Sequence, residues 1–420
     1  MSVITFADVV HQAISFSQDT PEEALLLRLI DTPWVQRLRD ISQTANTRLV
    51  YMFSEHSRFG HCLGVAYLAA LLLRKLETRH PDVVRPYRAA VLAAALLHDV
   101  GHLAPGAHTA YRTWFPDVAD NHEAIAAKIC CTDAQIAAIL SDYSQHLPQQ
   151  VASVIEEDPS LPAWTWELLS GGGWNVDRGN WCIVDSILAG VQYGHYNIPA
   201  LTDSLDISPQ GQLILQENRL DAMMHFAVSR HAMYRQIYQH RVLLSADTIN
   251  AAIVRRARDL GVGLDFADDT MREVLAAHTP DALSLHAIFR MREAWWRYHL
   301  FRWADGSDGI LADLSSRLIN RRLFKTVRLT PGDSTLRSQA QRAVEQIGLD
   351  PRYYLHEVST QAVHSGDSHQ AIQVRMDSGH IRPLADADPL FRTMMVEDQS
   401  TDKRWLVMPS EAKALLGRER

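Results

Sequence analysis

Apolar runs of helical length, separated by short polar segments, dominate the first three quarters of the chain. Residues 63–73 and 89–97 are almost entirely apolar, and shorter apolar runs occupy residues 24–30, 124–129 and 181–190. None of these runs alternates strictly between apolar and polar residues, as a half-buried strand would, so the pattern favours buried helices. The sequence therefore predicts a mainly α-helical protein.

Turn and capping signals set the expected bounds of several elements. Thr20, Pro21 and Glu23 are typical of a capping box with proline at the first helical position, so a helix is expected to begin at Pro21. Residues 201–215 are expected to form a β-hairpin, and residues 219–243 are expected to form one long helix.

The pattern changes after about residue 326. Short segments with alternating apolar and polar residues occur at 371–376, 393–396 and 405–408. Such alternation is typical of strands. The sequence therefore predicts a helical domain over residues 1–326 and a small C-terminal α+β domain over residues 327–420.

Composition and charge narrow the classes of function. The chain has 420 residues and a formal net charge of -8, which argues against a general nucleic-acid binder because such proteins carry a basic excess. Its four cysteines form no C-x-x-C pair, which is consistent with a reducing compartment. Since we find no secretory signal pattern and no apolar run of membrane-spanning length, we expect a cytoplasmic protein without a membrane partner.

A histidine and an aspartate, His98 and Asp99, directly follow the apolar run of residues 89–97. An ionised carboxylate at the end of a buried helix is costly unless it is paired or bound to a metal. Imidazole and carboxylate together form an ordinary site for a divalent metal. His61 and Asp177, which stand near the starts of two other apolar segments, complete a candidate set of four ligands.

The order H…HD…D resembles the signature of the HD-domain phosphohydrolases. Further motifs resemble the dNTP triphosphohydrolase branch of that family, which includes bacterial dNTPases and the human SAM-and-HD-domain dNTPase. These motifs cover about residues 20–326 and are Asp31-Thr-Pro-x-x-Gln36-Arg-Leu-Arg39, Arg58-Phe-x-His61, His98-Asp-x-Gly-His102, His122-Glu123, Asp177-Arg178 and Arg230…Tyr238-Gln239-His240-Arg241. The resemblance implies an HD-domain helical core and the hydrolysis of dNTPs to deoxynucleoside plus inorganic triphosphate.

The resemblance also implies a role for each matching residue. The metal ligands would be His61, His98, Asp99 and Asp177. His122, backed by Glu123, would act as general acid or base because a histidine pKa lies near neutrality, with His102 and His108 beside it at the phosphate site. Arginines would clamp the triphosphate through their bidentate forks, and polar side chains would contact sugar and base. The residues that would bind the substrate in this way are Gln43, Arg58, Arg178, Asp185, Arg230, Tyr234, Tyr238 and Gln239.

The sequence departs from the family pattern at several positions. The loop after His102 is one residue longer than the family loop, which leaves the role of His108 open. Trp181 replaces a tyrosine that packs on sugar and phosphate. Thr44 replaces a leucine that helps to exclude ribonucleotides, so the resemblance does not imply strict selectivity for deoxynucleotides.

Three residues near the start of the chain have two interpretations. Asp31, Gln36 and Arg39 match positions that read guanine at a regulatory site of the family, which would make the enzyme nucleotide-regulated. Alternatively, these side chains only cap and brace a short helix.

The expected cofactor is one divalent metal ion, and His/Asp ligation suits Fe, Mn, Zn, Ni or Mg. The expected partners are a nucleotide substrate and further copies of the same chain, in a dimer, tetramer or hexamer. Two other functions remain open. One is an HD phosphohydrolase that acts on a nucleoside monophosphate, (p)ppGpp or a cyclic nucleotide, and the other is a non-catalytic nucleotide sensor.

Overall fold

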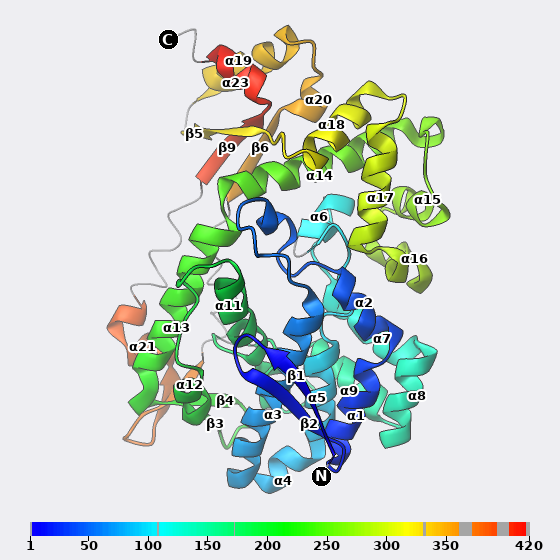
Figure 1. Ribbon diagram of the computed structural model, residues 1–420. Coiled ribbons are helices and arrows are strands. Elements are labelled where there is room, and N and C mark those ends of the chain that lie inside the picture. The colour runs from blue at the N-terminus through cyan, green and yellow to red at the C-terminus, as the bar shows by residue number, and fades with distance from the viewer. Residues whose placement is uncertain are drawn as a thin grey trace.

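The computed structural model describes residues 2–106, 109–171, 173–330, 333–360, 372–392 and 403–416. Helices make up most of it, as the apolar pattern predicts, and a small sheet lies near the C-terminal end (Figure 1). The predicted class, mainly α with a small C-terminal α+β region, is therefore confirmed.

Five helices build the core that carries the candidate site. Helix α3 (Arg58–Arg79) packs against α5 (Arg88–Leu97) and α11 (Val176–Leu188), and α5 also contacts α1 (Pro21–Ile30) and α9 (Leu147–Ile155). Every residue of α5 from Ala89 onward is buried. Helix α5 is apolar on all sides, and burial on all sides is what such a composition requires.

Helix α3 is long and apolar enough to cross a membrane by length and composition, although we expected no run of that kind. Within the protein, 72% of the 18-residue window is buried. The helix therefore occupies the position of a core helix, and its first two turns contribute side chains to the candidate site.

Several local expectations are wrong. Thr20 makes no capping hydrogen bond. The carboxylate of Glu23 instead accepts the backbone N–H of Ser17 at 2.7 Å and pairs with Arg74 at 3.0 Å. A carboxylate used to join a strand and a second helix is not available to close a capping box.

The expected single helix over residues 219–243 is interrupted. It consists of α13 (Leu220–Met233), a π-helical turn η5 (Tyr234–Tyr238) and a new helix α14 (Arg241–Leu260). The side chain of His240 caps α14 by accepting the backbone N–H of Val242. The π turn places Tyr234 and Tyr238 side by side, with ring centroids 5.2 Å apart.

The C-terminal region forms a three-stranded antiparallel sheet in the order β5 (Lys325–Leu329), β9 (Lys403–Met408), β6 (His356–Thr360). Helices α19 (Ser334–Gln346) and α23 (Ser410–Leu416) pack against each other beside it, and α14 runs below it (Figure 1). The expected strand at 405–408 lies within β9. The one at 393–396 lies outside the described residues.

A second sheet joins distant parts of the chain. The predicted hairpin is present as β3 (Leu205–Ile207) and β4 (Leu213–Gln216). Strand β4 also pairs in parallel with β7 (Gln373–Arg375), which in turn pairs with β8 (Ile381–Pro383). Part of residues 327–420 therefore extends a sheet that begins in residues 1–326, and the division of the chain into two domains at residue 326 stays a prediction.

The N-terminal residues form a hairpin that the sequence pattern did not indicate, β1 (Val3–Asp8) with β2 (Gln12–Ser17). Further helices of the described residues (Figure 1) are α2 (Pro33–Arg37), α4 (Pro81–Val84), α6 (Thr109–Trp114), α7 (His122–Thr132), α8 (Ala134–Tyr143), α10 (Trp164–Glu167), α12 (Ile198–Ser204), α15 (Asp269–Ala276), α16 (Leu285–Arg290), α17 (Glu293–Ala304), α18 (Gly309–Ile319), α20 (Pro351–Tyr354) and α21 (Leu384–Ala387).

Candidate active site

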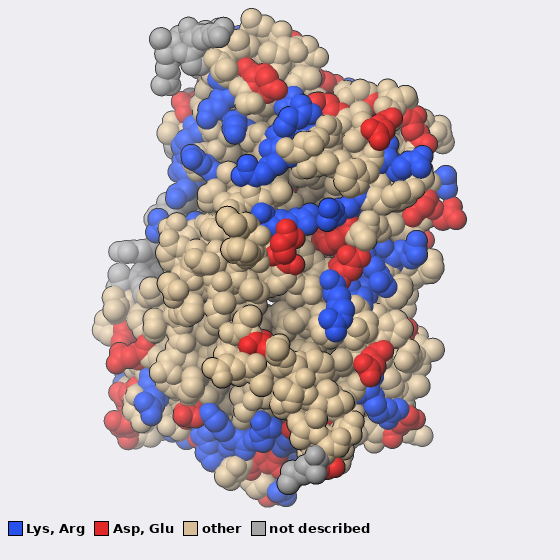
Figure 2. All heavy atoms as spheres, in the orientation of Figure 1, with Lys and Arg blue, Asp and Glu red and all other residues tan. Residues whose placement is uncertain are grey.

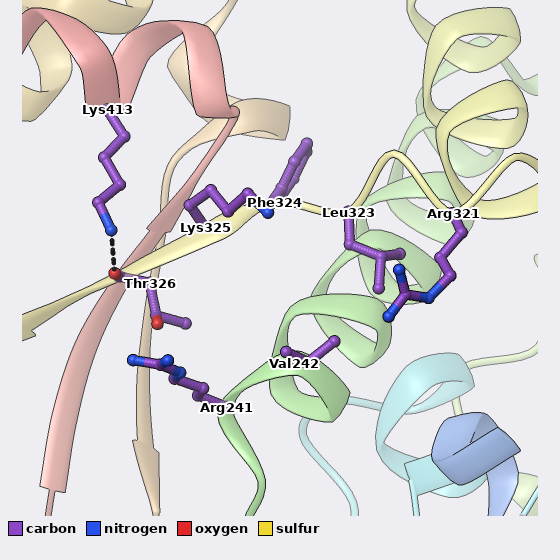
Figure 3. Close-up of a pocket in the computed structure, with 8 residues that line it drawn as sticks. All are labelled: Arg241, Val242, Arg321, Leu323, Phe324, Lys325, Thr326 and Lys413. Carbon is purple, nitrogen blue, oxygen red and sulfur yellow. Dashed lines mark hydrogen bonds between the residues drawn. The ribbon is translucent and has the colours of Figure 1, made fainter. Parts of the chain in front are cut away.

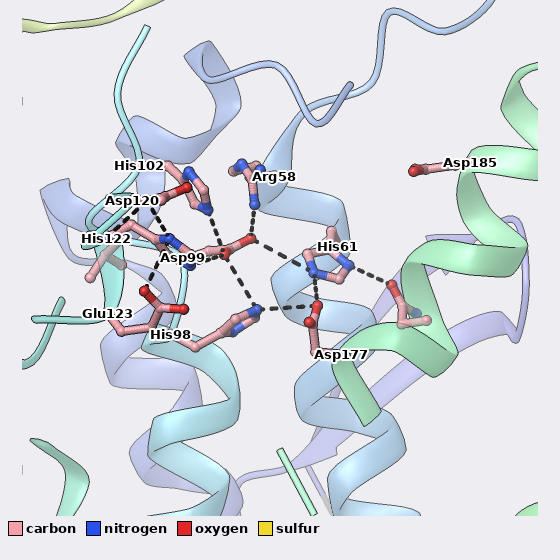
Figure 4. Close-up of polar contacts among 12 residues, drawn as sticks. Arg58, His61, His98, Asp99, His102, Asp120, His122, Glu123, Asp177 and Asp185 are labelled. Atoms are coloured by element: carbon pink, nitrogen blue, oxygen red, sulfur yellow. Dashed lines mark hydrogen bonds and ion pairs between the residues drawn. The ribbon is translucent and has the colours of Figure 1, made fainter. Parts of the chain in front are cut away.

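The four expected metal ligands converge although they come from three helices. His61 lies in the first turn of α3, His98 and Asp99 directly follow α5, and Asp177 lies in the first turn of α11 (Figure 4). Asp177 Oδ1 is 3.0 Å from His61 Nε2 and 3.7 Å from His98 Nε2. Asp99 lies 3.7 Å from His61 Nε2 and 3.5 Å from His98 Nε2. The ligand atoms of His61, His98 and Asp177 thus lie within 4.8 Å of one another, and Asp99 borders this group beside both histidines.

Hydrogen bonds fix which ring nitrogen of each histidine faces this group. The Nδ1 of His61 lies 2.9 Å from the amide oxygen of Asn180, and the Nδ1 of His98 lies 3.0 Å from the carbonyl oxygen of Ala95. Both oxygens can only accept, so each Nδ1 carries a proton, and in the neutral ring each Nε2 presents a lone pair. This orientation, with the outer nitrogen bonded to an oxygen, is usual for histidines that bind metals.

The donor set fits a divalent cation. Two carboxylates and two Nε2 lone pairs are acceptors that face one another, and the buried Nε2 of His98 has no hydrogen-bond partner among the described residues. Burial alone would lower the pKa of His98, but the carboxylates of Asp99 and Asp177 raise that pKa to about 9. The cluster therefore attracts positive charge, and imidazole with carboxylate is an ordinary ligand set for a divalent metal.

Arg58 and His102 hold Asp99 from the side of the cavity. Arg58 donates from Nη1 to Asp99 Oδ2 at 2.5 Å, and His102 Nε2 lies 3.1 Å from Asp99 Oδ1. Burial would raise the pKa of Asp99, but Arg58, His98 and His102 together keep it well below its usual range. The buried Nε and Nη2 of Arg58 have no partner within the described residues, so these N–H groups can bind an anion.

His122 at the start of α7 is the second histidine of this wall. Its ring stacks on that of His102, with centroids 3.9 Å apart. Its Nδ1 lies 2.9 Å from an oxygen of Asp120 and 3.2 Å from one of Glu123. Burial would lower the pKa of His122, but Asp120 and Glu123 raise it. The imidazolium form is therefore favoured, as a proton donor requires.

Glycine 101 makes this arrangement possible. A Cβ atom at Gly101 would lie 2.1 Å from the backbone oxygen of His122, a distance that no real Cβ contact shows. The absent side chain lets the start of α7 approach the turn that carries Asp99 and His102. In the sequence this glycine belongs to the motif His98-Asp-x-Gly-His102, and its role here is close packing.

A cavity of about 640 Å³ extends from the cluster. His98, Asp99 and Asp177 lie at its wall, whereas His61 is buried behind them. All the residues that the family resemblance assigned to substrate binding line this one cavity; they are Gln43, Arg58, Arg178, Asp185, Arg230, Tyr234, Tyr238 and Gln239. The catalytic candidates His102, His122 and Glu123 line it as well.

A hydrogen-bonded group lies farther along α11. Asp185 accepts from the hydroxyl of Tyr238 at 2.5 Å and bonds to Nε2 of His56 at 2.7 Å. It stands two turns, about 12 Å, beyond Asp177 on the same helix, and Figure 4 shows it apart from the cluster. Trp181 packs edge-on against Tyr238, with centroids 5.5 Å apart.

Three of the expected residues lie away from this cavity, and a fourth is not described. His108 lies outside the described residues. Asp31, Gln36 and Arg39 do not line the cavity. Gln36 donates to the carbonyl oxygen of Ile30 at 2.8 Å and accepts from Arg39 at 2.8 Å, which is the bracing role that we considered as the alternative.

Sequence reasoning missed several residues of the site. Asn180 lies one helical turn after Asp177, and Asp120 lies two residues before His122, so spacing could have indicated both. His56 lies two residues before Arg58, and only its residue type, a histidine close to a motif, could have indicated it. Arg37, which stands between Gln36 and Arg39 in the sequence, is buried and donates to the carbonyl oxygens of residues 288 and 291.

A second, smaller hollow of about 220 Å³ lies where α14 meets β5 and α23. Four basic side chains line it, Arg241, Arg321, Lys325 and Lys413 (Figure 3). Lys413 donates to the carbonyl oxygen of Thr326 at 3.2 Å, and Arg321 donates to that of Leu49 at 2.7 Å. Lys and Arg side chains gather over the C-terminal sheet on this face of the molecule (Figure 2).

Known proteins resemble this chain in sequence and in fold. The HD domain family model matches residues 58–157. The uncharacterised protein YwfO of Bacillus subtilis is 30% identical over 354 residues, which are 83% of this chain and 78% of that protein. The deoxynucleoside triphosphate triphosphohydrolase SAMHD1 of Gallus gallus is 26% identical over 56% of this chain and 42% of its own length.

Solved structures give the same picture. The crystal structure of a phosphohydrolase from Bacteroides thetaiotaomicron matches 97% of this chain and 100% of its own, with a TM-score of 0.81. At 21% sequence identity, this likeness shows the fold alone.

Proposed function

The chain belongs to the HD-domain phosphohydrolases related to the dNTPases, and from that membership we propose that it hydrolyses a dNTP to deoxynucleoside plus inorganic triphosphate. One observation carries the proposal. A single cavity joins the His/Asp cluster, three arginines and a hydrogen-bonded carboxylate two helical turns away. A dNTP carries a triphosphate for the arginines and the metal, and a sugar hydroxyl for the carboxylate, over a comparable length.

His61, His98, Asp99 and Asp177 would hold the metal ion. When bound, a divalent cation supplies a Lewis acid that polarises a phosphoryl oxygen and lowers the pKa of water. Arg58, Arg178 and Arg230 line the cavity and supply three positive charges for phosphate oxygens. Three such forks suit a polyphosphate better than a monophosphate, because each can pair with a different phosphoryl group.

His122 would deliver the proton that the leaving group needs. Hydrolysis adds water to the α-phosphorus and breaks its bond to the 5′-oxygen, which then needs a proton to leave as a hydroxyl. Nε2 of His122 lies 3.9 Å from Asp99 and faces the cluster, while Asp120 and Glu123 favour the protonated ring from behind. Proton transfer from a positioned histidine contributes typically 10²- to 10⁴-fold to a rate.

Asp185 and Tyr238 would bind the sugar. The carboxylate of Asp185 is buried and already engages Tyr238 and His56, so its geometry is fixed before substrate arrives. A carboxylate accepts up to about four hydrogen bonds, which leaves capacity for a 3′-hydroxyl. The rings of Trp181, Tyr234 and Tyr238 form an apolar surface beside it.

Product analysis tests the proposal. Metal-reconstituted protein is incubated with each dNTP and rNTP, with Asp99→Ala as the control, and the products are resolved by ion-exchange chromatography. Deoxynucleoside and triphosphate in equal amounts, lost in Asp99→Ala, are expected. Orthophosphate or pyrophosphate would contradict the dNTPase assignment and favour another HD phosphohydrolase, such as one for a nucleoside monophosphate, (p)ppGpp or a cyclic nucleotide. A protein that binds nucleotides without any turnover would be a sensor.

Nucleotide regulation and assembly into a homo-oligomer are further proposals. The basic hollow around Arg241 and Arg321 supports a second anion site, because four cations line it. The turnover of one dNTP and the molar mass of the protein in solution, which reports its oligomeric state, are measured with and without added GTP. An effector that changes neither quantity would contradict regulation.

A further inference from the structure

One carboxyl group of the substrate cavity has no role in the chemistry proposed above. Asp247 lies in the second turn of α14 and lines the cavity. Its Oδ1 accepts a hydrogen bond of 2.7 Å from Nδ2 of Asn46, which belongs to the 3-10 turn η2 (Ala45–Leu49). Asn46 is the only hydrogen-bond partner of the Asp247 side chain in the described part of the chain.

The surroundings of Asp247 match a flat ring with a polar edge. Leu243, Leu244 and Asp247 all line the cavity and follow one another on the same side of α14. Two leucines can pack on the face of a ring, while Asp247 and Asn46 remain available to its edge.

Asp247 lines the same cavity as Asp185 and Tyr238, the pair that would bind the sugar. Asp177 and Asp185 are separated by two turns of α11, and Asp185 bonds to Tyr238. Helix α14 begins three residues after Tyr238. A base attached to a sugar held by Asp185 and Tyr238 would lie within this cavity, and Asp247 is a polar group of the cavity wall.

The charge state of Asp247 determines what it can bind. Burial raises its pKa to about 6, although Asn46 and Arg112 act in the opposite direction. At pH 7 the group is mainly a carboxylate, which only accepts hydrogen bonds. Asn46 uses its Nδ2 on Asp247, and its own amide oxygen is a second acceptor beside the carboxylate.

We propose that Asp247 and Asn46 read the edge of the substrate base and select guanine; this inference rests on the proposed dNTPase function. Two neighbouring acceptors require two neighbouring donors. Guanine presents the N1–H and the 2-amino group side by side. Adenine and cytosine present one amino group next to a ring-nitrogen acceptor, and thymine presents one N–H between two carbonyl oxygens. Only guanine fits both acceptors.

Steady-state kinetics with base analogues test this assignment. The ratio of kcat/KM for dGTP to that for dTTP is measured in the wild type and in Asp247→Asn. The wild type is expected to prefer dGTP at least tenfold and to discriminate against dITP, which lacks the 2-amino group. Asp247→Asn is expected to lower the ratio by about 10- to 100-fold, the usual value of a bidentate contact to a base.

A gain of function separates base reading from a structural role. Xanthine carries a carbonyl oxygen where guanine has the 2-amino group, and the amide of Asp247→Asn can donate to that oxygen. The variant is therefore expected to hydrolyse dXTP better than the wild type does. Asp142→Asn is the matched control, because Asp142 pairs with Arg28 on the surface and does not line the cavity.

The outcomes distinguish this inference from the proposed function. If triphosphate is released but the wild type does not prefer dGTP, or Asp247→Asn leaves the dGTP to dTTP ratio unchanged, the inference is wrong and the dNTPase function stands. If no nucleotide yields triphosphate, the proposed function itself fails. Should Asp247→Asn not fold, Asn46→Ala is measured instead, and an unchanged ratio there overturns the inference equally.

Discussion

His102 and His122 stack with ring centroids 3.9 Å apart, yet their environments favour opposite charge states. Burial, Arg58 and the charge on His122 lower the pKa of His102, whereas Asp120 and Glu123 raise that of His122 against the effect of burial. A neutral ring beside a cationic one avoids like-charge repulsion. His122 is therefore suited to donate a proton, whereas the neutral ring of His102 lies beside Asp99, with Nε2 3.1 Å from Oδ1.

The first prediction concerns the basic side of the pH–rate profile. Asp120→Asn removes the carboxylate that bonds to Nδ1 of His122, so the pKa of His122 should fall. Since His122 must be protonated to act as an acid, kcat should begin to decline at a lower pH than in the wild type. Asp117→Asn changes an exposed carboxylate nearby and should leave the profile in place. Identical pH–rate profiles for all three proteins would show that His122 is not the general acid.

The second prediction concerns metal affinity. Asn180→Ala removes the acceptor that holds the Nδ1 proton of His61 and should weaken binding of Mn²⁺ or Zn²⁺ by about 10- to 100-fold, as losses of such outer partners do. Asn180→Asp keeps an oxygen acceptor and should restore most of the affinity. Calorimetric titration of the metal-free proteins measures both effects. Equal affinities in all three proteins would exclude the role we give to Asn180.

The third prediction concerns the approach of α7. Gly101→Ala places a methyl group against the backbone oxygen of His122, so α7 must shift. We expect a loss of about 3 kcal/mol in the free energy of unfolding and a loss of activity, because overpacking a filled site costs about 1–3 kcal/mol. Gly309→Ala, where a Cβ meets nothing within 4 Å, is the control and should unfold like the wild type. Denaturation in urea compares the variants.

The fourth prediction concerns stability in acid. Burial lowers the pKa of His356 on β6 to about 4, with a smaller contribution from Arg255 in the same direction. Between pH 6.5 and 4 the unfolded chain binds a proton that the folded chain does not, so the free energy of unfolding should fall as the pH falls through this window. We expect a contribution of about 3 kcal/mol, and His356→Gln should lack it. An equal acid response in the two proteins, measured by thermal unfolding, would be evidence against a neutral buried ring.

The cluster of metal ligands could be predicted because each ligand stands at the end or start of an apolar helix. Polar residues there are conspicuous, and helix packing brings such ends together. The substrate residues were found only through the family resemblance, since Arg230 and Tyr238 resemble the residues of any surface helix.

Other features depend on contacts between distant segments and leave no local signal. Arg37 lies among polar neighbours in the sequence, but carbonyl oxygens near residues 288–291 satisfy its guanidinium in the interior. Glu23 has the spacing of a capping box, but Ser17 and Arg74 engage it instead. Asp247 follows apolar residues of an ordinary helix, and only the position of Asn46 places it in the cavity wall.

The parallel pairing of β4 with β7 also bears on how the protein is made. Ile214 on β4 is fully buried, and its partner Gln373 is synthesised long after it. Until residues 373–375 leave the ribosome, one edge of the β3–β4 hairpin has no neighbour, and exposed strand edges invite pairing with other chains. A nascent chain stopped at residue 326 would keep that edge. The emergence of residues 373–375, rather than completion of the helices, therefore ends the period in which this protein is prone to aggregate.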